Sequence, residues 1–158
     1  MNGYRSELFL HVIFVVVALG PLFVMPLLQV TAEKRNAGAV RLYLDFLERV
    51  LRMFMLPGAV LVFVMGGLLM SSDHFYGHDN PPAWLVASLL WFVVAAVFGA
   101  VGLRSTMRQA RASLQGVPDE APVPAAYRQA GMWMQVILGL LGVSVVVIAY
   151  LMVQQPGR

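Results

Sequence analysis

The sequence contains no cysteine and little charge. Only 12% of its 158 residues are Asp, Glu, Lys or Arg, about half the share found in soluble domains. The absence of cysteine excludes disulfides, thiolate nucleophiles, thiolate zinc sites and covalently attached c-type haem. The shortage of charge excludes a water-soluble globule of this size, because charged side chains keep such a surface in water.

Hydrophobic residues make up 59% of the chain and gather in four long blocks. The blocks cover about residues 8–30, 54–70, 84–103 and 132–153. Each is close to the ~20 residues that cross ~30 Å of hydrocarbon as an α-helix. Backbone groups in lipid must pair within their own segment, so such spans are helices. The sequence therefore predicts an all-α fold: a single domain over 1–158, a four-transmembrane-helix bundle with antiparallel neighbours.

The basic residues are unevenly distributed along these blocks. Nine of the eleven flank the first connection, about 31–40, and the third, about 105–128, whereas the second connection, 71–82, has none. Positively charged connections stay in the cytoplasm. The pattern predicts a multi-pass protein of the bacterial inner (cytoplasmic) membrane with its N and C termini outside. The net charge of +3 then reflects contact with the lipid bilayer, and nucleic acid is not expected as a partner.

All three histidines fall on the predicted outer side. His11 lies about one turn inside the first span, and His74 and His78 lie in the second connection. Imidazole binds metals and haem iron, relays protons or forms hydrogen bonds between helices. His11, His74 and His78 are therefore candidate metal ligands for copper or zinc. The alternative is a structural His11 with two solvated histidines in a loop.

An amphipathic segment, residues 42–58, precedes the second apolar block. Two carboxylates in it have arginines four residues later, which predicts the pairs Asp45–Arg49 and Glu48–Arg52. One interpretation is an interfacial extension of the second span. In the other, Glu48 and Arg49 help to bind an anionic cofactor group such as a porphyrin propionate. No hydrolase, nucleotide-binding or zinc-protease motif is present, so we do not expect an enzyme.

Prolines are expected to shape the first two spans and the third connection. Pro21, Pro26 and Pro57 should bend or loosen the helices that contain them. The third connection includes the stretch VPDEAPVPAA, which should be irregular, because each proline removes a hydrogen-bond donor and disfavours helix before it.

The first two spans resemble a known group of bacterial membrane proteins. FLHVIFVVVALGPLFVMPLL resembles the first span of HemJ-type protoporphyrinogen oxidases and CopD-like proteins, and LERVLRMFMLPGAVLVFVMGGLLM resembles their second. The matching residues are His11, Leu22, Phe23, Pro26, Glu48, Arg49, Pro57, Gly67 and Leu68. Over essentially its whole length the chain is most similar to the bacterial family called domain of unknown function 2269.

One departure limits what the HemJ resemblance implies. Proteins of that type have a Lys and a His in the third span, and residues 84–103 contain neither. A two-histidine haem clamp between the first and third spans cannot form. The resemblance implies an altered haem or metal site at His11, with haem b as the possible cofactor.

Three functions are compatible with these features. The leading one is a membrane protein without catalytic activity, which forms a homo-oligomer or serves as an accessory subunit of a membrane complex. The alternatives are a b-type haem protein with His11 as axial ligand and a copper- or zinc-handling membrane protein.

Overall fold

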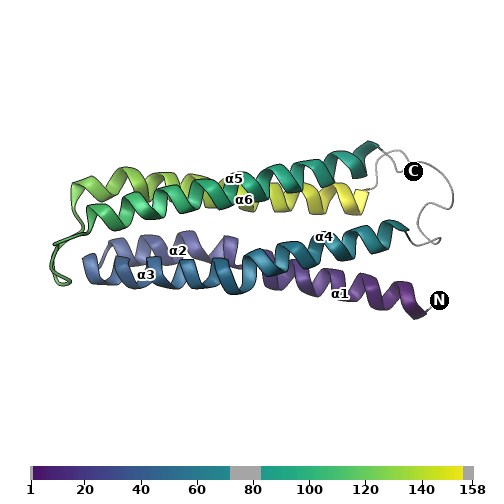
Figure 1. Cartoon of the computed structure of the whole chain (residues 1–158), viewed down its shortest axis with the longest axis horizontal. Helices are drawn as coiled ribbons and strands as arrows, with labels where there is room; N and C mark the ends of the chain where they lie inside the picture. Colours follow the sequence, from purple (N-terminus) through teal and green to yellow (C-terminus); the bar gives the residue numbers. More distant parts are fainter. Residues whose placement is uncertain (1, 72–82, 155–158) are drawn as a thin grey trace.

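A computed structural model describes residues 2–71 and 83–154, and all the regular elements in these ranges are helices. α1 and α2 follow each other end to end, as do α3, the π-helical turn η1 and α4 (Figure 1). The elements are α1 (Asn2–Leu19), α2 (Pro21–Glu33), α3 (Ala37–Val50), η1 (Leu51–Met55), α4 (Leu56–Ser71), α5 (Ala83–Ser113) and α6 (Ala125–Gln154).

Four helical stretches are long and apolar enough to cross a membrane, which confirms the predicted fold class. They are Ser6–Glu33, Ala37–Leu69, Ala83–Ser113 and Ala125–Gln154. α1 packs on α4, α2 packs on α3 and α6, and α5 packs on α6. Successive spans run in opposite directions, and α1 begins at the same end of the bundle at which α6 ends (Figure 1).

The helices are longer than the apolar blocks within them. At 1.5 Å per residue, stretches of 28 to 33 residues are about 42–50 Å long and exceed the ~30 Å hydrocarbon layer. The predicted connection over 31–40 is therefore too long, because only residues 34–36 separate α2 from α3. Similarly, α5 continues to Ser113, past the predicted start of the third connection. The helices continue because their polar residues extend beyond the lipid into water.

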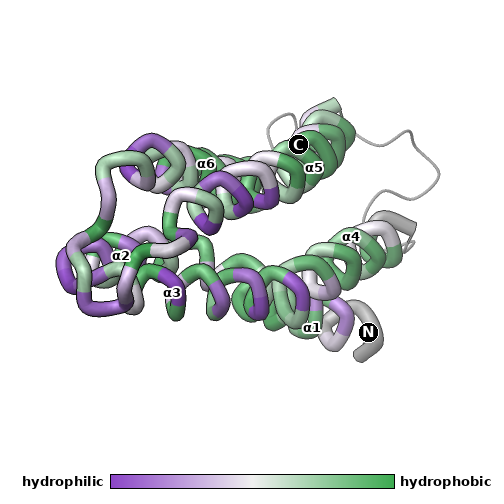
Figure 2. The backbone as a smooth tube through the Cα atoms, turned by 60° about the vertical axis from the view of Figure 1, so that its left-hand side comes forward, coloured by the Kyte–Doolittle hydropathy of each residue, from purple (hydrophilic) through white to green (hydrophobic). Residues whose placement is uncertain are grey.

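The hydrophilic residues gather at one end of the bundle, where α2 meets α3 and α5 connects to α6 (Figure 2). We call this the charged end and the opposite one the outer end. The tightly packed core also lies mainly toward the charged end. Its largest fully buried side chains are Tyr127, Leu44, Leu47, Leu103, Leu114, Met134, Leu138, Gln29 and Val40.

A buried amide joins three helices inside this core. Gln29 of α2 is fully buried, and its Nε2 donates to the Gly131 carbonyl of α6 at 2.8 Å and to Glu33 Oε1 at 2.7 Å. Tyr43 of α3 donates its hydroxyl to Gln29 Oε1 at 3.5 Å. The side chain of Gln29 thereby ties α2 to both α3 and α6.

The third connection folds back over the start of α3. Asn36 caps that helix by accepting a hydrogen bond from the Ala39 amide at 2.8 Å. The amides of Ala37 and Gly38 donate to carbonyls of the connection, at Ala121 and Asp119, both at 2.9 Å. These two hydrogen bonds pair amides that have no partner within α3 and hold the proline-rich segment against the start of that helix. The segment is irregular, as predicted. Gly116 in this connection has φ +75°, a conformation that glycine adopts at little cost.

Arg41 fastens the same segment from the side of α3. Its guanidinium forms an ion pair with Asp119 and donates to the carbonyls of Leu114, at 2.6 Å, and Val117. The connection between α5 and α6 is therefore attached to the second span.

Pro21 and Pro57 lie at irregularities of the first two spans, as expected, whereas α2 continues without a break through Pro26. Gly20 separates α1 from α2, and Pro21 occupies the first position of α2, where its missing N–H is not needed. In the second span the helix widens just before Pro57, where the Leu56 amide donates to the Leu51 carbonyl five residues earlier. The wider turn accommodates Pro57, which has no N–H to donate, so the span continues past the proline.

α1 and α4 lie very close to each other at Gly58. A methyl group on Gly58 would lie 2.3 Å from the Ala18 Cβ and 3.1 Å from the Ala18 Cα. Small residues at a membrane helix interface allow backbones to come this near. This contact sets the distance and register of the first hairpin.

We expect Gly58→Ala to lower the stability of the protein in detergent micelles by roughly 1–3 kcal/mol, since the added methyl overlaps a buried residue. Gly67→Ala is the matched control in the same helix, because a methyl there meets no atom within 4 Å. Thermal unfolding followed by circular dichroism measures both. Equal melting temperatures for the two variants would contradict the close contact.

Gln29→Ala should destabilise the charged end by about 1–3 kcal/mol, because it leaves buried hydrogen-bonding groups unpaired. The control is Gln109→Ala, a change at an exposed helical glutamine for which about 0.5 kcal/mol or less is expected. Chemical denaturation in micelles compares the two. A Gln29 variant as stable as the control would show that the buried amide does not hold the helices together.

Candidate functional site

An apolar cleft lies between the four spans toward the outer end. It has a volume of about 390 Å³ and is lined by residues of α1, α4, α5 and α6. Its only polar side chains among the described residues are His11 and Ser88. The cleft exists because the helix pairs α1–α4 and α5–α6 each pack closely, while α4 and α5 make little contact with each other.

His11 is the one ionisable residue on the wall of this cleft. The residue is only 8% exposed. Its ring lies beside α4, and its Cε1 atom is 3.6 Å from the position that a Cβ atom would occupy at Gly66. The Nδ1 atom is buried and has no hydrogen-bond partner in the part of the chain that the structure describes. An unsatisfied buried group of this kind costs about 1–3 kcal/mol, and native structures usually pair such groups with water, an ion or a ligand.

Ser88 of α5 is also buried, but its hydroxyl is satisfied. It donates to the Trp84 carbonyl of its own helix at 2.8 Å. The hydroxyl of Ser144 likewise donates to the Leu140 carbonyl at 2.8 Å. These serines behave as helix-bonded residues of a membrane span, which leaves His11 as the polar group with unused capacity.

Glu48 and Arg49 do not lie near His11. Both belong to the end of α3, eighteen residues before the point where Gly66 faces His11, which is about 27 Å along a helix axis. Glu48 takes part in an ion-pair network on the charged side of the bundle, and Arg49 is exposed. The residues expected to bind one cofactor are thus divided between two regions of the molecule.

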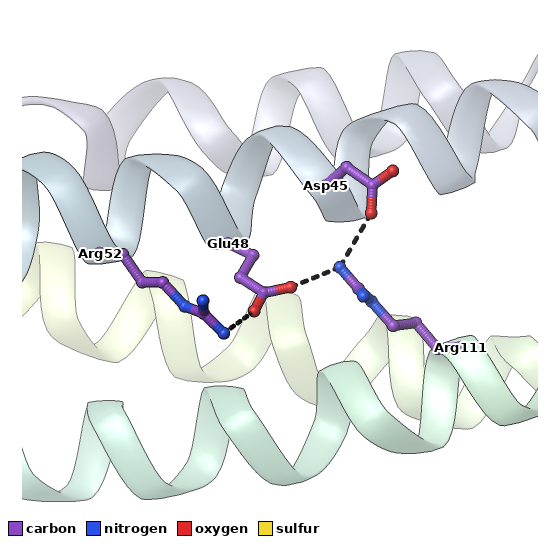
Figure 3. A network of polar contacts seen from close by, with 4 residues as sticks. All are labelled: Asp45, Glu48, Arg52 and Arg111. Carbon is purple, nitrogen blue, oxygen red and sulfur yellow. Dashed lines mark hydrogen bonds and ion pairs between the residues drawn. The ribbon is translucent and has the colours of Figure 1, made fainter.

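The ion-pair network links the second and third spans. Arg111 of α5 reaches between Asp45, at 2.9 Å, and Glu48, at 2.6 Å, and Glu48 also pairs with Arg52 (Figure 3). The predicted pair Glu48–Arg52 is confirmed. The predicted pair Asp45–Arg49 is wrong, because α5 lies alongside α3 and brings Arg111 to Asp45.

His74 and His78 lie outside the described residues, so the expected grouping of three histidines is untested. Within residues 2–71 and 83–154, no three side chains of His, Asp or Glu are arranged to bind one metal ion. The copper or zinc site therefore stays a prediction.

Gln29 was not among the residues expected to have a role. It is a polar residue inside the first apolar block, at 8–30, and the rule that singled out His11 applies to it equally. The structure gives Gln29 a structural role, since its side chain is bonded to α6 and to residues of its own hairpin. Neither Tyr43 nor Tyr127 carried a signal in the sequence, because an aromatic residue in an apolar helix is ordinarily part of the core.

Comparison with known proteins places this architecture in a family. Among curated proteins and solved structures, none matches the chain closely enough to establish a relationship. A family model described as "Predicted integral membrane protein (DUF2269)" matches residues 8–156, which covers nearly the whole chain and all four spans. The chain therefore belongs to the DUF2269 family of integral membrane proteins.

Proposed function

We propose that this chain is a non-catalytic membrane protein that binds a lipid-soluble ligand in the outer cleft, with His11 as its polar contact. One observation carries the proposal: a buried imidazole nitrogen without a partner beside an otherwise apolar cleft of about 390 Å³. A ligand with an apolar body and one hydrogen-bonding or metal-containing group would satisfy the imidazole. It would also fill a space that is too apolar to hold ordered water.

The composition of the cleft argues against a coupled transporter. Its one described ionisable residue, His11, lies toward the outer end of the bundle, whereas ion-coupled transport depends on ionisable groups near the middle of the membrane. Binding without translocation is the simpler use of this space.

Haem b is the second candidate, and the HemJ resemblance suggests it. His11 supplies an axial nitrogen, and Met152 on the same cleft is a residue type that ligates haem iron. However, no Lys or Arg lines the cleft to pair with propionates, and Glu48 and Arg49 lie too far away. The described residues therefore fit one axial position of a haem and not the whole group.

Copper or zinc handling is the third candidate and depends on His11 together with His74 and His78. A borderline metal would take neutral imidazoles as ligands. Only His11 belongs to the described part of the chain, so this proposal is supported by residue chemistry alone.

We also propose that the chain associates with copies of itself or with another membrane subunit. Gly139 on α6 is exposed and has open space where a side chain would be. Exposed small residues allow a further transmembrane helix to approach closely.

The ligand proposal predicts a molecule that co-purifies with the protein. Organic extraction and mass spectrometry of detergent-purified protein should recover about one equivalent, and His11→Leu should reduce it about tenfold, the value of one buried polar contact. Thr106→Val is the control, because Thr106 is a buried polar residue whose hydroxyl donates only to its own helix. Equal recovery from wild type and His11→Leu, or none from either, would reject the proposal.

The same preparations distinguish the cofactor candidates. A Soret band in wild type that disappears in His11→Ala identifies haem, whereas colourless protein from haem-replete cells rules it out. A copper or zinc content near zero after dialysis eliminates the metal.

For orientation, we propose an inner-membrane protein with the charged end in the cytoplasm, as its arginines favour. The natural chain has no cysteine, so single cysteines report topology without background. A membrane-impermeant maleimide should label His78→Cys in intact spheroplasts and label Glu120→Cys only after permeabilisation. The reverse labelling pattern would show that the charged end faces the outside and would contradict the proposed orientation.

A further inference from the structure

A basic recess separates the second span from α5 near the charged end. It has a volume of about 490 Å³ and lies between the end of α3, the π-helical turn and α5. Its lining includes four arginines and one carboxylate, above a floor of apolar side chains. The charged members are Glu48, Arg52, Arg104, Arg108 and Arg111.

Two of these arginines are not neutralised by the protein. Arg52 and Arg111 pair with Glu48, and Arg111 also pairs with Asp45 (Figure 3). Arg104 and Arg108 are exposed and form no ion pair with any described residue. The recess thus holds an excess of positive charge and unused guanidinium donors, which are suited to a phosphate group.

The recess lies at the level where the apolar spans begin. Arg104 directly follows the apolar stretch of α5, and Arg52 directly precedes that of the second span. At this depth an exposed guanidinium meets lipid headgroups. The phosphate groups of neighbouring lipids therefore lie at the same depth as these arginines.

The recess also adjoins an apolar groove. Leu51 and Leu56 line both the recess and a narrow groove of about 80 Å³ that runs between the two hairpins. Small residues form much of the groove wall, namely Ala59, Ala95, Ala96, Gly99 and Ala100. A polar pocket beside an apolar groove matches a phosphate headgroup followed by the upper part of an acyl chain.

We propose that this recess binds one anionic glycerophospholipid, with its phosphate on Arg104 and Arg108 and an acyl chain in the groove between α4 and α5. The arginine recess shares no lining residue with the His11 cleft, whereas the groove shares Leu19, Phe92, Val145 and Ile148 with it. Variants of the arginines therefore test the phosphate contact while His11 stays unchanged. Glu48 limits the affinity, because it holds two further arginines that would otherwise contact the phosphate.

Native mass spectrometry in detergent, with phosphatidylglycerol or phosphatidylcholine added stepwise, tests the site. Wild type should retain one phosphatidylglycerol more tightly than phosphatidylcholine. Each arginine near an anionic headgroup contributes roughly a factor of five, so Arg104→Gln combined with Arg108→Gln should weaken phosphatidylglycerol binding by about 25-fold. Glu48→Gln should strengthen it, which is the opposite sign from general damage to the fold.

The control combines Arg35→Gln with Arg128→Gln, which removes the same charge from exposed positions outside the recess. It should change the affinity by less than about twofold, because an exposed distant charge is screened. Equal retention of the two lipids, an equal loss in the control, or weaker binding in Glu48→Gln would overturn the proposal. Full competition by millimolar inorganic phosphate would show a free-phosphate site and overturn the assignment to a lipid.

Discussion

Lipid gives apolar helices no hydrophobic reason to associate, and this constraint determines where the protein places its tight packing. The ion pairs and the buried Leu44, Leu47 and Leu114 lie toward the charged end, outside the apolar blocks, where the helices extend beyond the hydrocarbon. There, exclusion of water can drive association. Toward the outer end the hairpins separate, and a cleft forms where α4 and α5 make little contact.

Much of this fold could be predicted from the sequence because long apolar blocks leave few options. Four helical spans, their antiparallel order and the irregular proline-rich connection follow from length, hydropathy and proline chemistry. The ends of the helices did not follow, since charged helical turns such as 105–113 read equally well as a connection. The pairing of Asp45 was also missed, because it depends on which helix lies beside α3.

The site could be predicted only in part. His11 stood out as an ionisable residue in an apolar span, and the structure places it, largely buried, on the wall of an apolar cleft. The cleft itself has no signature in the sequence, because it arises from how far α4 and α5 separate in space, which hydropathy does not determine. The division between His11 and Glu48 follows from the same cause: the apolar blocks show which residues share a span and not which spans share a pocket.

The widened turn at Leu51–Met55 has a consequence for the spacing of the second span. A π turn contains one residue more than an α-helical path over the same distance. Relative to an uninterrupted α-helix, it therefore rotates the residues that follow by about 100° around the helix axis. The π turn therefore helps to set the angle around the axis between the buried face of α3 and the α1-facing side of α4, which carries Gly58 and Gly66. A single deletion between residues 51 and 55 would rotate both glycines off α1, whereas deletions in the exposed stretch around Pro118 would leave the phase of every helix unchanged.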